Sequence, residues 1–135
     1  MRANAKPYRL ERLLAALADR TRLRLLNLMS GREVCVCYFV EILRQSQPKV
    51  SRHLAYLRQA GIVRARRDGK WMHYRIERPA DAGAAAILDA TLASFAADRQ
   101  MRAECSQLDQ ACCRPERYVA LARAPIPSGM ETRRA

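Results

Sequence analysis

The middle of the chain constrains the fold most strongly, because two short helical patterns lead directly into a signal for a β-hairpin. The first pattern begins at Cys37 or Tyr38 and ends near Arg44. Ser46-Gln47-Pro48 then has the form of an N-cap followed by a first-turn proline, and Gly61 can close the helix that it opens. The sequence therefore predicts two helices joined by a tight turn.

The hairpin signal is Asp68-Gly69, which separates two extended runs, Ile62–Arg67 and Lys70–Ile76. Two helices joined by a tight turn can place the second helix in the major groove of DNA. A hairpin beside that pair would form a wing. We therefore predict a winged helix-turn-helix, a mainly α fold with a small β-hairpin (α+β).

The flanking segments are expected to be helical. Leucines at helical spacing predict one helix from about Tyr8 and another that Asp19 caps, followed by a short extended piece at Val34–Val36. An alanine-rich stretch predicts one long helix from Asp81 to Glu104, whose small side chains would allow close helix approach. We expect a homodimer through the terminal helices; the alternative is a helix packed only on its own domain.

The expected domain covers residues 1–123 and includes a last helical piece after Pro115. Residues 124–135, with their prolines, Ser128 and Gly129, are expected to form a disordered tail. No apolar run approaches the length that a membrane span needs, and the N-terminus lacks the apolar stretch of a signal peptide. We therefore expect a cytoplasmic protein without a membrane partner.

The charge balance favours a polyanionic partner. Twenty-five Lys and Arg residues against thirteen Asp and Glu leave a formal net charge of +12. The predicted second helix is basic without compensating acids, so we expect it to read double-stranded operator DNA, and the wing to reach phosphates or the minor groove. The expected DNA contacts are Gln47, Lys49, Ser51, Arg52, His53, Arg66, Arg67 and Lys70.

Within this set, Gln47, Lys49 and Arg52 are the candidates for base-edge contact. The hydroxyl of Ser51 suits a phosphate, although a neutral surface role would explain it equally. His53 lies beside the apolar Leu54, so hydrogen bonding within the helix pair is as good an interpretation as DNA contact.

All five cysteines fall in two clusters, Cys35-Val36-Cys37 and the group Cys105, Cys112 and Cys113. An odd number of cysteines in a reducing compartment argues against a disulfide framework and favours metal binding or redox chemistry. Free cysteine is also commonly buried as a small apolar residue, and this alternative stays open for Cys35 and Cys37.

Three segments together resemble the ArsR/SmtB family of metal-responsive repressors: Leu17–Leu26, Glu33–Cys37 and Ser46–Leu54. The resemblance implies a winged helix-turn-helix dimer that binds operator DNA when it is free of metal. It also implies that ion binding lowers DNA affinity and derepresses resistance genes.

Arsenic- and antimony-sensing members of this family carry the motif Glu-Leu-Cys-Val-Cys-Asp-Leu-Cys. Cys35 and Cys37 match its first two cysteines, but Val40 stands in place of the third. Trivalent arsenic and antimony favour three thiolates, so this pair alone is incomplete. We therefore expect As(III) or Sb(III) as the inducer, without an organic cofactor, at a site formed by Cys105, Cys112 and Cys113, with Cys35 and Cys37 as a candidate second site.

The spacing of the C-terminal cluster sets a geometric condition. On a straight helix, positions 105 and 112 lie ~10 Å apart along the axis, too far to share one ion. We expect the chain to bend between Ser106 and Ala111; the alternative is that the donors come from two subunits.

Other functions are less well supported by the sequence. The resemblance disfavours zinc, because the zinc-sensing branch of the family uses Asp and His ligands on its last long helix and residues 81–104 contain no histidine. A cadmium- or lead-responsive repressor and a thiol-redox regulator remain alternatives. An enzyme is not expected, because no phosphate loop, paired carboxylates or Cys-x-x-Cys pair is present.

Overall fold

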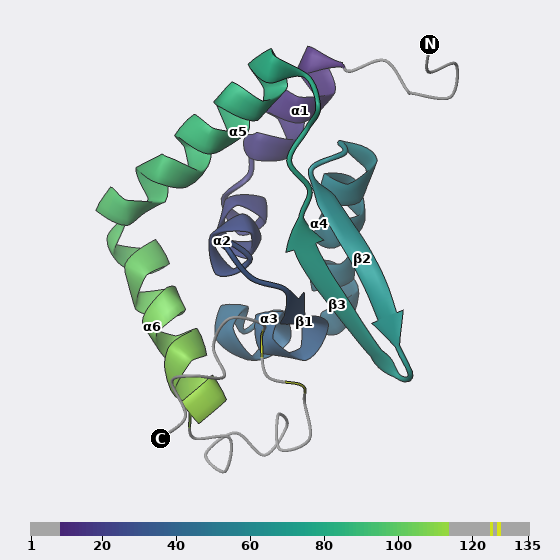
Figure 1. The fold of residues 1–135 in the computed structure, drawn as a ribbon. Coiled ribbons are helices and arrows are strands. Elements are labelled where there is room, and N and C mark those ends of the chain that lie inside the picture. Colours follow the sequence, from purple (N-terminus) through teal and green to yellow (C-terminus); the bar gives the residue numbers. More distant parts are fainter. Residues whose placement is uncertain (1–8, 114–124, 126, 128–135) are drawn as a thin grey trace.

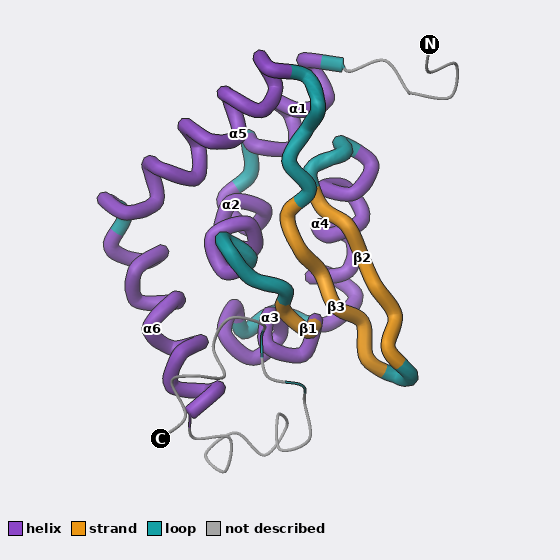
Figure 2. Tube along the Cα trace, in the orientation of Figure 1, coloured by secondary structure: helices purple, strands orange, loops and turns teal. Residues whose placement is uncertain are grey.

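The structure is a computed structural model that describes residues 9–113, 125 and 127. Within the described residues, four helices and a small sheet surround the core, and two further helices run along one side of the molecule (Figure 1; Figure 2). The elements are, in chain order, α1 (Leu10–Leu17), α2 (Arg20–Leu28), β1 (Val34–Cys35), α3 (Val36–Leu43), α4 (Gln47–Gln59), β2 (Val63–Asp68), β3 (Trp71–Ile76), α5 (Ala82–Ser94), the 3₁₀ turn η1 (Phe95–Ala97) and α6 (Arg99–Cys113).

The helix starts follow the capping residues that the sequence indicated. The Asp19 carboxylate accepts a hydrogen bond from Arg22 N at 3.0 Å, and α2 begins directly after it. Ser46 caps α4 in the same way, with Pro48 in the first turn. Arg44 ends α3 in the left-handed conformation, with φ 56°, which produces the tight turn between α3 and α4.

The wing is a hairpin of β2 and β3 in the predicted place, with Gly69 at positive φ in its turn. The sheet has a third strand that the sequence analysis described only as an extended piece. Strand β1 pairs antiparallel with β3, so that Cys35 lies opposite His73, and the strand order is β1-β3-β2. The hairpin is thereby fastened to the start of α3.

The core is one cluster of buried residues to which the described helices and the sheet all contribute. The inner face of α4 contributes Val50, Leu54 and Leu57, all fully buried. Phe39 of α3 lies in the same cluster and packs its ring against Tyr74 of β3, with ring centroids 6.4 Å apart. Burial of this inner face fixes which side of α4 points outward.

The predicted single helix over 81–104 is wrong. Helix α5 ends at Ser94, the η1 turn follows, and Asp98 takes extended backbone angles before α6 begins. Phe95 is buried at this corner, and the Asp98 carboxylate accepts a hydrogen bond from Met101 N at 3.0 Å, which starts a new helix. The chain turns here so that α6 can pack on α2 and α3.

The predicted bend between Ser106 and Ala111 is also wrong, because α6 continues as one helix to Cys113. Leu108 and Ala111 are fully buried, so this turn of the helix is held against the core. The expected helix after Pro115 lies outside the described residues, as do Tyr8 and, apart from residues 125 and 127, the expected tail at 124–135. Within the described part of the chain no helix is both long and apolar enough to cross a membrane.

Candidate DNA-reading surface and thiol clusters

The outer face of α4 presents the polar residues expected to meet DNA. Gln47, Lys49 and Arg52 are exposed on the side opposite the buried Val50 and Leu54. A basic, solvent-facing first half of a helix that follows a tight turn has the composition of a recognition helix.

Ser51 and His53 lie at the edge of this face and are half-buried. The His53 Nδ1 atom is 3.7 Å from Asp19 Oδ2 and 3.4 Å from Arg22 Nη1, and both of these partners lie at the start of α2. Burial lowers the pKa of His53, which keeps its ring neutral near pH 7. His53 therefore lies where α4 packs against the start of α2, and not within the α3–α4 pair, where the sequence analysis placed its alternative hydrogen bond.

The wing residues Arg66, Arg67 and Lys70 are all exposed, but their surroundings differ. The Arg66 guanidinium donates to both oxygens of Glu33, at 2.7 and 3.2 Å, and this pairing lowers the pKa of Glu33. The Lys70 ammonium lies 5.1 Å from the centre of the Trp71 ring. Part of the positive charge of the wing is therefore already paired within the protein.

The first thiol cluster brings two sulfurs together at the junction of β1 and α3. Cys37 Sγ donates a hydrogen bond to Cys35 Sγ across 3.2 Å. This bond lowers the pKa of Cys35 to about 7 and raises that of Cys37 above its usual range. The pair can therefore supply one thiolate near neutral pH in the unliganded protein, although Cys35 is almost fully buried.

The second thiol cluster is carried by α6. Cys105 is half-buried against α2, with its Sγ 3.8 Å from Asn27 O, whereas Cys112 and Cys113 lie in the last turn of the helix. Because α6 is continuous, the backbone positions of Cys105 and Cys112 are separated by ~10 Å along the axis. Among the side chains that the structure describes, no three Cys, His, Asp or Glu residues converge to hold a metal ion.

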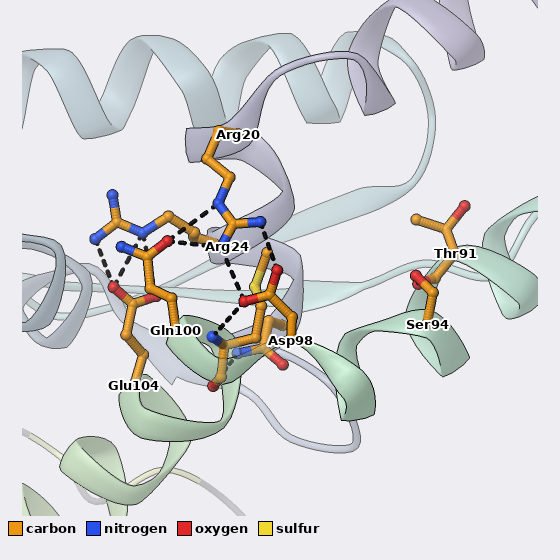
Figure 3. A network of polar contacts seen from close by, with 9 residues as sticks. Arg20, Arg24, Thr91, Ser94, Asp98, Gln100 and Glu104 are labelled. Carbon is orange, nitrogen blue, oxygen red and sulfur yellow. Dashed lines mark hydrogen bonds and ion pairs between the residues drawn. The ribbon is translucent and has the colours of Figure 1, made fainter.

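A series of polar contacts fastens α6 to α2 (Figure 3). Arg20 donates to Asp98 at 2.7 and 2.9 Å and to Gln100 at 2.7 and 3.0 Å. Arg24 Nε donates to both Glu104 oxygens, at 3.0 and 3.1 Å, and the Glu104 side chain is only 6 % exposed. Glu104, which precedes Cys105, is thus part of a buried ion pair with α2, the helix before the DNA-reading unit formed by α3, α4 and the β2–β3 wing.

The sequence analysis did not identify this network. Arg20 and Arg24 are one turn apart on α2, and that spacing shows only that they share a face. Their acidic partners lie about eighty positions further along the chain, and the helix break at Asp98 that brings them into reach was not expected. Arg22 was missed as well, because its contacts depend on how three helices pack.

Comparisons with known proteins agree with this architecture. Residues 19–65 match the family described as bacterial regulatory protein, arsR family. The arsenical resistance operon repressor of Escherichia coli (strain K12) is 50% identical over 78 residues, which cover 57% of this chain and 67% of that protein. The arsenic resistance transcriptional regulator ArsR2 of Pseudomonas putida is 38% identical over 91 residues, which cover 64% of this chain and 79% of that protein.

Among solved structures, the AntR antimony-specific transcriptional repressor has a similar fold. Its TM-score is 0.51 at 28% sequence identity, and the match covers 73% of this chain and 92% of that chain. The match extends beyond the helix-turn-helix segment, since it covers more of the chain than residues 19–65.

Proposed function

Because the chain belongs to the ArsR family of DNA-binding transcriptional repressors, we propose that it binds operator DNA as a homodimer and is released when As(III) or Sb(III) binds its thiolates. Family membership confirms the predicted winged helix-turn-helix and shows a regulator, not an enzyme. The inducer, the ligands and the dimer are our inference, as is a cytoplasmic location.

The exposed basic face of α4 supports the DNA part of the proposal. Gln47, Lys49 and Arg52 would meet base edges, while Arg67 and Lys70 of the wing would lie along the phosphates. The remaining expected contacts, Ser51, His53 and Arg66, would act at the edge of this surface.

Two apolar surfaces support a dimer through the terminal helices. Leu10 and Leu14 are one turn apart on α1 and are 46% and 47% exposed. Helix α5 exposes Ala82, Ala86 and Ala90 on its outer side, which would let a second helix approach closely. Burial of such residues against a second copy is favourable because apolar surface leaves water.

Thiol chemistry and the two relatives support a metalloid inducer. One relative is named an arsenical resistance operon repressor and the other an antimony-specific repressor. Soft trivalent ions favour thiolate donors, and this chain has five cysteines in two clusters. We propose Cys105, Cys112 and Cys113 as the principal ligands, with Cys35 and Cys37 as a second, two-sulfur site.

The continuous α6 changes the expected arrangement of the principal site. One subunit cannot bring Cys105 and Cys112 to a single ion without unwinding the helix, because ~10 Å separates them along its axis. We therefore propose that the donors come from two subunits. This was the alternative to the bend that the sequence analysis preferred.

The contacts of α6 with α2 supply a route from ion to DNA. Cys105 follows Glu104, whose carboxylate pairs with Arg24, and Cys105 Sγ itself faces Asn27 O. Ligation of Cys105 would draw it out of the seam, which is the interface between α2 and α6, and would shift these two helices relative to each other. By linkage, an ion that weakens operator binding must itself bind more weakly to the operator complex.

Ion stoichiometry tests the ligand assignment. Equilibrium dialysis with arsenite should show ion binding to wild type that is lost in Cys105→Ser and in Cys112→Ser/Cys113→Ser. Mixed dimers of these two variants should recover half of the binding, because each mixed dimer rebuilds one site across the interface. Loss of binding only in Cys35→Ser and Cys37→Ser would overturn the assignment.

Further arms of the same experiment separate the alternatives. A cadmium- or lead-responsive repressor would bind those ions and not arsenite. A thiol-redox regulator would release DNA with peroxide in the absence of any metal ion, whereas the proposed mechanism requires reduced thiols.

A further inference from the structure

Arg22, at the start of α2, satisfies the C-terminal end of α1. Its Nε donates to Ala16 O at 2.8 Å and its Nη2 donates to Ala15 O at 3.0 Å. The last carbonyls of a helix lack the usual partners of the next turn. Ala15 O accepts from Ala18 N at 3.2 Å, and the guanidinium adds a second donor there and a donor at Ala16 O. One side chain therefore fixes the end of α1 to α2.

The same guanidinium contacts one turn of α4. Its Cζ lies 4.1 Å from the centre of the Tyr56 ring, and its Nη1 lies 3.4 Å from His53 Nδ1. His53 and Tyr56 are three residues apart and thus neighbours on one helix face. An arginine can only donate, so Nδ1 accepts from Arg22 in the tautomer of the neutral His53 ring that carries its proton on Nε2.

The turn of α4 that Arg22 contacts lies next to the exposed, basic face of this helix. Arg52 precedes His53 in the chain and is exposed, while the opposite side of the helix is held by the buried Leu54 and Leu57. The apolar face limits how far α4 can move away from the core. The contacts of Arg22 limit how far α4 can rotate or slide relative to α1.

We propose that Arg22 is a positioning residue for operator binding, which holds α4 at a fixed orientation to α1. In a dimer built through α1, this link sets the separation of the two recognition helices and so the preferred spacing of operator half-sites. The inference rests on the DNA-binding and dimer parts of the proposed function and is independent of the thiols. A lysine cannot replace this arginine, because its single ammonium cannot donate to two carbonyls while stacking flat on a ring.

The test uses a duplex selected from random-sequence DNA with the wild-type protein, together with a version carrying one extra base pair between the half-sites. Arg22→Gln and Arg22→Lys should each weaken binding to the selected duplex roughly tenfold, within the range of couplings between contacting residues. Both variants should also discriminate less between the two duplexes than wild type does. Arg99→Gln is the charge-matched control: Arg99 is exposed at the start of α6, and its removal should leave spacing discrimination unchanged.

The salt dependence separates positioning from direct phosphate contact. Each lost phosphate contact lowers the slope of log affinity against log salt by about 0.9, whereas a positioning residue leaves the slope unchanged. A lower slope in Arg22→Gln, or unchanged affinity and spacing discrimination, overturns the inference.

Tyr56→Leu provides a second variant if Arg22→Gln does not fold. Tyr56 is 40% exposed, so its replacement removes the stacked ring and leaves the buried face of α4 intact. It should reduce spacing discrimination in the same direction, and unchanged discrimination overturns the inference. Wild-type protein that selects no duplex at all would overturn the proposed function together with this inference, whereas wild-type binding with unaffected variants overturns this inference alone.

Discussion

The DNA-reading unit and the α2–α6 seam use arginine in opposite ways. On α4 and the wing, Arg52 and Arg67 are exposed to solvent. In the seam, Arg24 points inward to Glu104, and the two side chains are only 13% and 6% exposed. The formal charge of +12 is therefore unevenly available to DNA. Position in the fold decides whether an arginine attracts DNA or holds two helices together.

The largest expected effect comes from breaking the buried ion pair between Arg24 and Glu104. Glu104→Gln leaves the Arg24 guanidinium without its counter-charge, so the free energy of unfolding should fall by about 3–5 kcal/mol. Chemical denaturation measures this change in the free energy of unfolding. Asp89→Asn removes the exposed pair with Arg78 and should leave the free energy of unfolding nearly unchanged, because solvent screens this pair. Equal losses in the two variants would contradict the distinction between seam and surface.

The next largest effect is expected at Arg52, which is exposed on the outer face of α4. Arg52→Ala should lower operator affinity by about 1–3 kcal/mol and relax sequence preference at one base position, because the proposed base-edge contact would be lost. Competition binding against duplexes with single base changes measures both quantities. A uniform loss across all sequences, with a lower salt slope, would instead identify Arg52 as a phosphate contact.

A smaller effect is expected at Arg66, which is exposed on the wing and is also paired with a carboxylate of the protein. Glu33→Gln removes the carboxylate that pairs with Arg66, so this guanidinium becomes available to phosphate. The slope of log affinity against log salt should become steeper by about 0.9, equivalent to one added phosphate contact. An unchanged slope would show that this part of the wing does not approach DNA.

The smallest effect lies at the first thiol pair. The pKa of Cys35 is about 7 because Cys37 donates a hydrogen bond to it, so Cys37→Ala should raise that pKa. Since the folded-state pKa lies below the ordinary 9.0, the stability contributed by this thiolate is present above pH 9 and is lost as pH falls through about 7. Ultraviolet thiolate absorbance in a variant with Cys105, Cys112 and Cys113 changed to Ser measures the shift. A titration midpoint that does not move in Cys37→Ala would contradict this account of the pair.

The two regions also differ in how much the sequence could predict. Ser46, Pro48 and the Asp68-Gly69 turn act through their immediate neighbours, so the helices and the wing were predicted to within a few residues. The pairing of β1 with β3 joins segments about forty residues apart and was missed for that reason.

The helix break at Asp98 is the clearest failure. An alanine-rich segment has high helix propensity throughout, and propensity alone favours one long helix. Tertiary packing of Phe95 and the Asp98 cap overrides it. The expected bend near the cysteines failed because it was chosen to bring three sulfurs together, whereas buried Leu108 and Ala111 keep α6 straight against the core.

The measurement that tests the central claim most directly is release of operator DNA by arsenite and antimonite, followed by gel shift. Wild type and the Cys35→Ser/Cys37→Ser variant should both release the duplex, because the proposed principal ligands lie on α6. The Cys105→Ser/Cys112→Ser/Cys113→Ser variant should stay bound at saturating ion. Release of that triple variant at the same ion concentration as wild type would contradict the account.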